Sequence, residues 1–407
     1  MFRRRLAASF AVVTLSAACV AALPGTAGAD PGLTSASTAW LVSQQQPDGG
    51  FEVAAFPGFE TSDAVYALAA QAQTGSWDTT SALSTVLGTK ASTGKTPLDA
   101  LDDWAETGLS RGQAAKLIAL VARPLGLDPS DFDWACDGGP GANLVATMGS
   151  PDPDGSYGPT STLNATLYGA IASRAVNGSV DPATVTFIRA AQQANGSWNY
   201  DGNPAGADQD IDTTSLALQA LAAAGVTTGD ADYDAGVAFL AGLQQPNGSW
   251  RSFGADDPNS TSSAILGLLP VSGTADLAGA VAWLQSQVQP NGHITSPNDG
   301  FGVNTFATAQ GIQGIQLGTS GASGSPGFPA LTAKASTYCA AQVTTTVPTT
   351  APASSSVAGN TAAAGTLPRT GGGTDGPSGV LLVIGCTALV LGAGLVRIRT
   401  RAVRRTP

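Results

Sequence analysis

The sequence predicts an all-α fold, a toroid in which six helical hairpins follow one another and close into a double ring. Three observations lead to this class. A short phrase ending in Gly and an aromatic residue recurs along the chain, an Ala-rich run with apolar residues at helical spacing precedes it, and a second, more apolar run follows it. Repeats of roughly 40 to 50 residues are typical of stacked helical pairs. We place the toroid at residues 30–342, between a signal peptide and a C-terminal anchor.

Residues 1–29 are predicted to form a signal peptide. The arginines at positions 3–5 precede an apolar run at 6–23, and Ala27 and Ala29 offer a cleavage site. A transmembrane anchor is the alternative, but a Gly/Pro break and the cleavage site follow the apolar run. We therefore expect the chain to be exported and cut after Ala29.

Each occurrence of the recurring phrase marks one predicted hairpin. It ends in Gly50-Phe51, Gly155-Ser156-Tyr157, Gly196-Ser197-Trp198, Gly248-Ser249-Trp250 and Gly292-His293-Ile294. Gly permits a tight turn, and the aromatic residue is predicted to pack as a wedge between neighbouring hairpins. The second unit lacks the phrase in place. Inner helices are expected to begin near Ser62, Ser110, Ala165, Thr213, Thr261 and Thr305, with a final helix at 329–341.

The C-terminus carries a sorting signal. Leu367-Pro368-Arg369-Thr370-Gly371 matches the LPXTG motif of Gram-positive surface proteins, an uncharged apolar run at 379–396 is long enough to cross a bilayer, and a basic tail follows it. The match implies that a sortase cuts before Gly371 and joins Thr370 to peptidoglycan. A protein that stays in the membrane is the alternative. Residues 343–366, almost all Thr, Ala, Pro, Ser and Val, are predicted to form a disordered stalk through the wall.

The composition excludes several classes of function. The 407 residues include 18 Lys and Arg and 29 Asp and Glu, a formal net charge of −11, which argues against nucleic-acid binding. The single histidine, His293, makes a Ser-His-Asp triad or a zinc site hard to build. We expect no metal and no cofactor, although acidic loops such as Asp152-Pro153-Asp154-Gly155 leave a calcium site open. Outside the signal peptide and the membrane run, the cysteines are Cys136 and Cys339. They are predicted to form a disulfide, with two buried thiols as the alternative.

The turn phrases resemble the Gln…Gly-Ser-Trp repeats of squalene–hopene cyclases, within the terpenoid cyclase and protein prenyltransferase toroid superfamily. The cobalamin carriers share this (α/α)6 barrel. The resemblance implies the toroid fold over most of 31–342. It also raises the possibility of a terpenoid cyclase or prenyltransferase activity, or of cobalamin binding. The cobalamin carriers add a β-domain, for which this sequence has no segment.

Asp208, Asp210 and Asp212 are the candidate acids. Class II terpene cyclases protonate their substrate with an Asp-X-Asp-Asp motif, and the resemblance places Asp210 and Asp212 on its first two acids, with Thr213 in place of the last. Capping is the alternative for Asp212, and it is the one we expect. When the units are aligned, the residues expected just before the inner helices are all good N-caps. They are Thr61, Asn164, Asp212, Ser260 and Asn304. Interchangeable caps at one position predict a structural role.

The sequence does not indicate an aromatic-lined cavity, because the inner-helix runs carry only Tyr66, Tyr168 and Phe306. We therefore expect a cell-wall-anchored surface protein whose toroid binds a small molecule, a glycan or another protein at its mouth. The alternatives are an extracellular cyclase or prenyltransferase that uses Asp210 and Asp212, a cobalamin carrier, and a structural spacer. Sortase and peptidoglycan are the expected partners.

Overall fold

The computed structural model of the protein describes residues 31–52, 58–134, 141–158, 162–206, 209–271, 273–299 and 302–320. Over these ranges the chain is mainly helical, as the sequence predicts. The signal peptide, the stalk, the sorting signal, the final helix at 329–341, Cys136 and Cys339 lie outside them. Among the described helices none is long and apolar enough to cross a bilayer.

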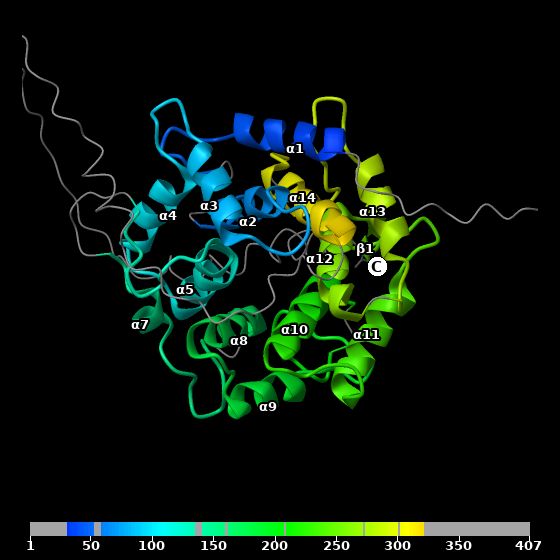
Figure 1. Ribbon diagram of the computed structural model, residues 1–407. Coiled ribbons are helices and arrows are strands. Elements are labelled where there is room, and N and C mark those ends of the chain that lie inside the picture. The colour runs from blue at the N-terminus through cyan, green and yellow to red at the C-terminus, as the bar shows by residue number, and fades with distance from the viewer. Residues whose placement is uncertain are drawn as a thin grey trace, which may run out of the picture.

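The helices form an inner and an outer layer around a common centre (Figure 1). The inner helices are α2 (Glu60–Gln71), α5 (Arg111–Leu117), α8 (Leu163–Asn177), α10 (Ile211–Ala223), α12 (Pro258–Leu268) and α14 (Thr305–Ser320). The outer helices are α1 (Pro31–Ser43), α4 (Pro97–Ala105), α7 (Leu144–Met148), α9 (Pro182–Ala190), α11 (Ala231–Leu243) and α13 (Leu277–Ser286). Most inner-helix residues are buried, whereas the outer helices bury only one face.

Shorter elements complete the described chain. Helix α3 (Thr79–Gly88) packs against α2 and α4, and a π-helix (Ile118–Ala122) and α6 (Arg123–Leu125) continue α5. A two-stranded hairpin, β1 (Arg251–Ser252) and β2 (Ala255–Asp256), precedes α12, and a 3₁₀ turn (Leu269–Val271) follows it.

The inner layer is a closed ring. Helix α2 packs against the π-helix that continues α5, α5 packs against α8, α8 against α10 and α10 against α12, and α14 lies between α12 and α2. Across the closing contact, Gln313 Nε2 donates a hydrogen bond to the carbonyl oxygen of Asp63 at 2.9 Å, and Gln316 Nε2 donates one to that of Gln73 at 2.8 Å. The outer layer closes too, because Gly292 packs so tightly against Ala36 of α1 that a β-carbon would overlap the Ala36 carbonyl.

The turn phrases join each hairpin to the next. Trp198 and Trp250 are fully buried, and their indole N–H groups donate to the carbonyls of Ile188 and Leu240 at 2.6 and 2.7 Å. The backbone N–H that follows each turn donates to a threonine hydroxyl of the next inner helix. The pairs are Phe51–Thr61, Tyr157–Thr166, Trp198–Thr214, Trp250–Thr261 and Ile294–Thr308, at 2.8 to 3.1 Å. These turn-bonded threonines define a common register for the inner helices.

Candidate functional site

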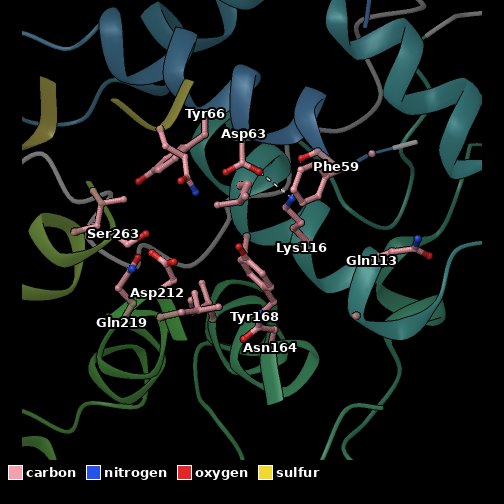
Figure 2. A pocket seen from close by; sticks show the side chains of 18 of the residues that line it. Phe59, Asp63, Tyr66, Gln113, Lys116, Asn164, Tyr168, Asp212, Gln219 and Ser263 are labelled. Atoms are coloured by element: carbon pink, nitrogen blue, oxygen red, sulfur yellow. Dashed lines mark hydrogen bonds and ion pairs between the residues drawn. The ribbon is translucent and has the colours of Figure 1, made fainter. Parts of the chain in front are cut away.

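The inner helices surround a cavity of about 150 Å³ (Figure 2). Its lining follows the register of the turn-bonded threonines. Most of the lining residues on five inner helices lie two before, two after or five after that threonine, a spacing that places them on one face of each helix. They are Phe59, Asp63 and Tyr66; Asn164, Tyr168 and Ile171; Asp212, Leu216 and Gln219; Ser263 and Leu266; and Phe306, Gln310 and Gln313. Helix α5, its π-helical continuation and α6 add Gln113, Lys116, Leu120 and Arg123.

Aromatic rings gather at this cavity. Phe59, Tyr66, Trp104, Tyr168 and Phe306 line it, and the rings of Phe59 and Phe306 stack with centroids 4.7 Å apart. The sequence alone does not indicate this aromatic lining. Two of these rings come from outside the inner-helix runs, since Phe59 lies just before α2 and Trp104 projects from α4.

An ion pair lies at the α2 and α5 side of the cavity. Lys116 Nζ lies 2.8 Å from Asp63 Oδ2, and both side chains are largely buried. The ammonium also donates to the carbonyl oxygen of Phe59 at 3.1 Å and lies 5.3 Å from the centroid of the Phe59 ring. Arg123 is buried on the same side, where desolvation lowers the pKa of its guanidinium. Asp63 neutralises the charge of Lys116 locally, and Arg123 is a second positive group on this wall.

Asp210, not Asp212, caps helix α10. The Oδ1 atom of Asp210 accepts a hydrogen bond from the backbone N–H of Thr213 at 2.9 Å, and its Oδ2 atom accepts one from the Thr213 hydroxyl at 2.7 Å. The prediction that Asp212 is the cap is therefore wrong. Asp212 lies in the first turn of the helix and lines the cavity.

The misplaced caps have a simple cause. The loop from the turn to the inner helix varies in length, so Trp198 is 16 residues from its threonine and Trp250 only 11 residues from its own. Aligned on the threonines, the residues before α8, α10, α12 and α14 lie four positions earlier and are Thr162, Asp210, Asp257 and Asn304, whereas α2 begins one residue before Thr61. Thr61, Asn164 and Ser260 consequently lie inside their helices, as Asp212 does.

Asp212 occupies an unusual environment for a carboxyl group. Its Oδ2 atom accepts a hydrogen bond from Ser260 Oγ at 3.2 Å, while its Oδ1 atom is buried and accepts none from any described residue. Burial, followed by the charges of Asp210 and Asp257, raises the pKa of Asp212 from 3.8 to about 7. Burial also raises the pKa values of Asp210 and Asp257. Both the protonated and the ionised form of Asp212 are therefore populated near neutral pH.

No protein-family model matches the chain, and no curated protein matches it. The solved structures that it resembles include those of a type II terpene cyclase. This enzyme is MstE from Scytonema. Its apo structure is 14% identical and gives a TM-score of 0.47, covering 70% of this chain and 96% of MstE. A variant with geranylgeranyl dihydroxybenzoate, its substrate, is 15% identical and gives a TM-score of 0.49, covering 71% and 96%. The likeness concerns the fold alone.

The other residues singled out in the sequence lie elsewhere. Asp208 falls outside the described residues. Both carboxylate oxygens of Asp152 accept from Arg111 Nη1 at 2.9 and 2.8 Å, and Asp154 Oδ1 accepts from the backbone N–H of Ser156 at 3.0 Å. The ring of His293 packs 5.4 Å from that of Trp40, away from the cavity. In the described ranges, no three His, Cys, Asp or Glu residues are grouped so that they could hold a metal ion.

Proposed function

We propose that the protein binds a small organic molecule in the central cavity. The observation that carries this proposal is the lining, in which aromatic faces surround a few convergent polar groups, the usual composition of a ligand site. The polar groups come from helices that are far apart in sequence, and the turn-bonded threonines hold those helices in register. Such an arrangement is costly to maintain, because it buries charged groups that water would otherwise solvate.

The volume of the cavity limits the size of the ligand that it can hold. An engineered cavity of about 150 Å³ holds a molecule as small as benzene, and drug-sized ligands occupy pockets of about 300 Å³ or more. The volume of about 150 Å³ therefore suits one ring or a short chain. It argues against cobalamin and against a folded polyprenyl chain in this conformation.

Blocking the cavity tests the proposal. Leu216 lines the cavity on α10, so Leu216→Trp is expected to fill it and Leu216→Met to leave it open. A one-ring ligand that raises the melting temperature of the wild type and of Leu216→Met should leave Leu216→Trp unchanged. A set of aromatic and aliphatic fragments screened by thermal shift makes the measurement. Ligands that stabilise Leu216→Trp as much as the wild type would place binding elsewhere.

Acid catalysis is a second candidate function, favoured by the state of Asp212. A buried carboxyl that is partly protonated near neutral pH can deliver a proton from its unpartnered Oδ1 side, and the surrounding ring faces can stabilise a carbocation. This is the chemistry of the class II terpene cyclases that the turn phrases resemble. Incubation with squalene and with prenyl diphosphates, followed by product analysis, tests it, and turnover of such long chains would require the cavity to open beyond about 150 Å³. Products that disappear in Asp212→Asn would establish the enzyme, and unchanged substrates would leave binding as the function.

We further propose that the toroid is displayed on a Gram-positive cell wall. The support is the order of signals in the sequence, with a signal peptide at 1–29, a stalk at 343–366 and the motif Leu367–Gly371 before the apolar run at 379–396. Export would also place the cavity outside the cell, so its ligand would be an extracellular molecule.

Changing the acceptor residue of the sorting motif tests this location. In Thr370→Ala the sortase loses the residue that it would join to peptidoglycan, so the protein is expected to move from the wall fraction to the membrane or the medium. Cell fractionation with immunoblotting makes the measurement, and Ser354→Ala in the stalk is the matched control. Wall attachment that persists in Thr370→Ala would refute sortase anchoring.

A further inference from the structure

We infer that the ligand of the cavity is a primary ammonium compound, whose N–H groups donate to Asp212 Oδ1 and Asn164 Oδ1. This inference rests on the proposed binding function and adds the chemical class of the ligand.

Two unpartnered acceptors point to a donor. Asp212 Oδ1 and Asn164 Oδ1 are both buried, and neither accepts a hydrogen bond from any described residue. Both residues line the cavity, and both lie two positions before the turn-bonded threonine on helices that pack against each other, α10 and α8. A buried acceptor left without a donor costs about 1–3 kcal/mol. A ligand that supplies donors to both atoms recovers that cost.

The charge of this wall favours a cationic donor. Asp212 is the carboxyl group that lines the cavity on the α10 side, and Asp210 and Asp257 lie close enough behind it for their charges to act on it. Ser260 is the neutral group that hydrogen-bonds Asp212, through Oδ2 at 3.2 Å. The positive groups, Lys116 and Arg123, belong to the opposite wall, where Asp63 pairs with Lys116 at 2.8 Å. A cation beside the acid wall gains charge-assisted hydrogen bonds, which are about twice as strong as neutral ones.

The aromatic residues supply the rest of the site. Tyr168 lies one helical turn from Asn164 on α8, and Figure 2 shows Asp212, Tyr168 and Asn164 projecting from α10 and α8 with the Asp63–Lys116 pair beyond them. Ring faces attract ammonium groups. The cavity of about 150 Å³ then has room for one ring attached to the ammonium, as in benzylamine.

Three probes of similar shape separate the contributions. Benzylammonium carries charge and N–H donors, benzyltrimethylammonium carries charge alone, and benzyl alcohol is neutral. With the full chain at pH 8, calorimetry is expected to show benzylammonium binding at least about tenfold more tightly than either of the others. Between pH 7 and pH 5 its affinity should fall about tenfold per pH unit, because Asp212, with its pKa of about 7, must be ionised to pair with it.

Variants at the two acceptors locate the contact. Asp212→Asn should lower the affinity for benzylammonium at least about tenfold, and Asn164→Leu several-fold, with benzyl alcohol binding unchanged in both. Asn259→Leu is the matched control. Its Oδ1 atom is also buried without a hydrogen-bond donor and lies two positions before Thr261, but it does not line the cavity.

The outcomes distinguish this inference from the function on which it rests. Benzyl alcohol that binds as tightly as benzylammonium, and is excluded by Leu216→Trp, would overturn the ammonium assignment and leave cavity binding intact. Benzyltrimethylammonium that binds equally tightly would overturn the N–H contacts. Failure of all three probes, together with failure of the fragment screen, would remove both proposals.

Discussion

At pH 8 the Asp212→Asn protein is expected to be more stable than the wild type, by about 4 kcal/mol in the free energy of unfolding. The reason is the pKa of Asp212, which rises from 3.8 to about 7 in the folded chain. A carboxyl with a raised folded-state pKa stabilises the fold only while it is protonated. Above pH 7 the folded protein must hold a buried anion, whereas the asparagine amide is neutral, has nearly the same shape and keeps an acceptor for Ser260.

The pH dependence gives the prediction its sign. Below pH 4 both the folded and the unfolded wild type are protonated at Asp212, so the advantage of Asp212→Asn should vanish. It should grow as the pH rises from about 4 and reach a plateau a little above 7. Urea unfolding at several pH values measures it. Asp181→Asn, at the exposed N-cap of α9, is the control and should change little, because Asn caps almost as well as Asp. A wild type as stable as Asp212→Asn at pH 8 would show that the Asp212 anion is well solvated.

Stability gained by removing Asp212 would itself indicate function. A residue that lowers stability is retained where its chemistry is used. The proposed roles both need the carboxyl at this place, as an anion that pairs with an ammonium group or as an acid that donates a proton.

Trp198→Ala is expected to lower the free energy of unfolding by about 4 kcal/mol, as is typical for truncating a buried aromatic side chain. Trp198 is fully buried, and its indole donates to the Ile188 carbonyl at 2.6 Å. The ring also packs directly on Gly236 of α11, where a β-carbon would lie 2.7 Å from it. The substitution therefore leaves a cavity between two hairpins and removes the indole hydrogen bond to the Ile188 carbonyl.

The control for this prediction is Trp283→Ala. Trp283 is a half-buried tryptophan of the outer helix α13, so its truncation should cost well under half as much. Urea unfolding followed by circular dichroism compares the two. Equal losses would mean that Trp198 contributes no more to packing than a residue at the edge of the toroid.

Much of the fold could be predicted because the turn phrases are local. Gly196 has a φ of +90°, which favours glycine, and the aromatic residue that follows the turn is buried. Both requirements restrict the residue type at a fixed position, so the turn can be recognised from the sequence alone. The helices on either side follow from apolar spacing. The start of each inner helix could not be placed as well, since the loop before it varies in length and several polar residues there could each serve as a cap.

The site could be predicted only in part for the same reason. The sequence identifies Asp210 and Asp212 as a pair of candidate acids. An error of two residues in the predicted start of the helix, however, assigns the cap to Asp212 instead of Asp210. The signal that identifies the lining is the stripe Asp212, Leu216 and Gln219, with polar groups on a helix whose other buried positions are small or apolar. Phe59 and Trp104 carry no such pattern, because only the packing of separate helices brings their rings to the cavity.

The closure of the inner ring has a consequence for how the chain acquires its structure. Gln313 meets Asp63 across 250 residues and Gln316 meets Gln73 across 243, so the contacts that seal the ring are among the last that a growing chain can make. Contacts between residues so distant in sequence slow folding. Until α14 arrives, the open arc leaves apolar flanks of α2 and α12 uncovered, and these are surfaces through which incomplete chains can associate. The central cavity is complete only once Gln313, the last of its lining residues, has been synthesised, so a shorter chain lacks part of the lining.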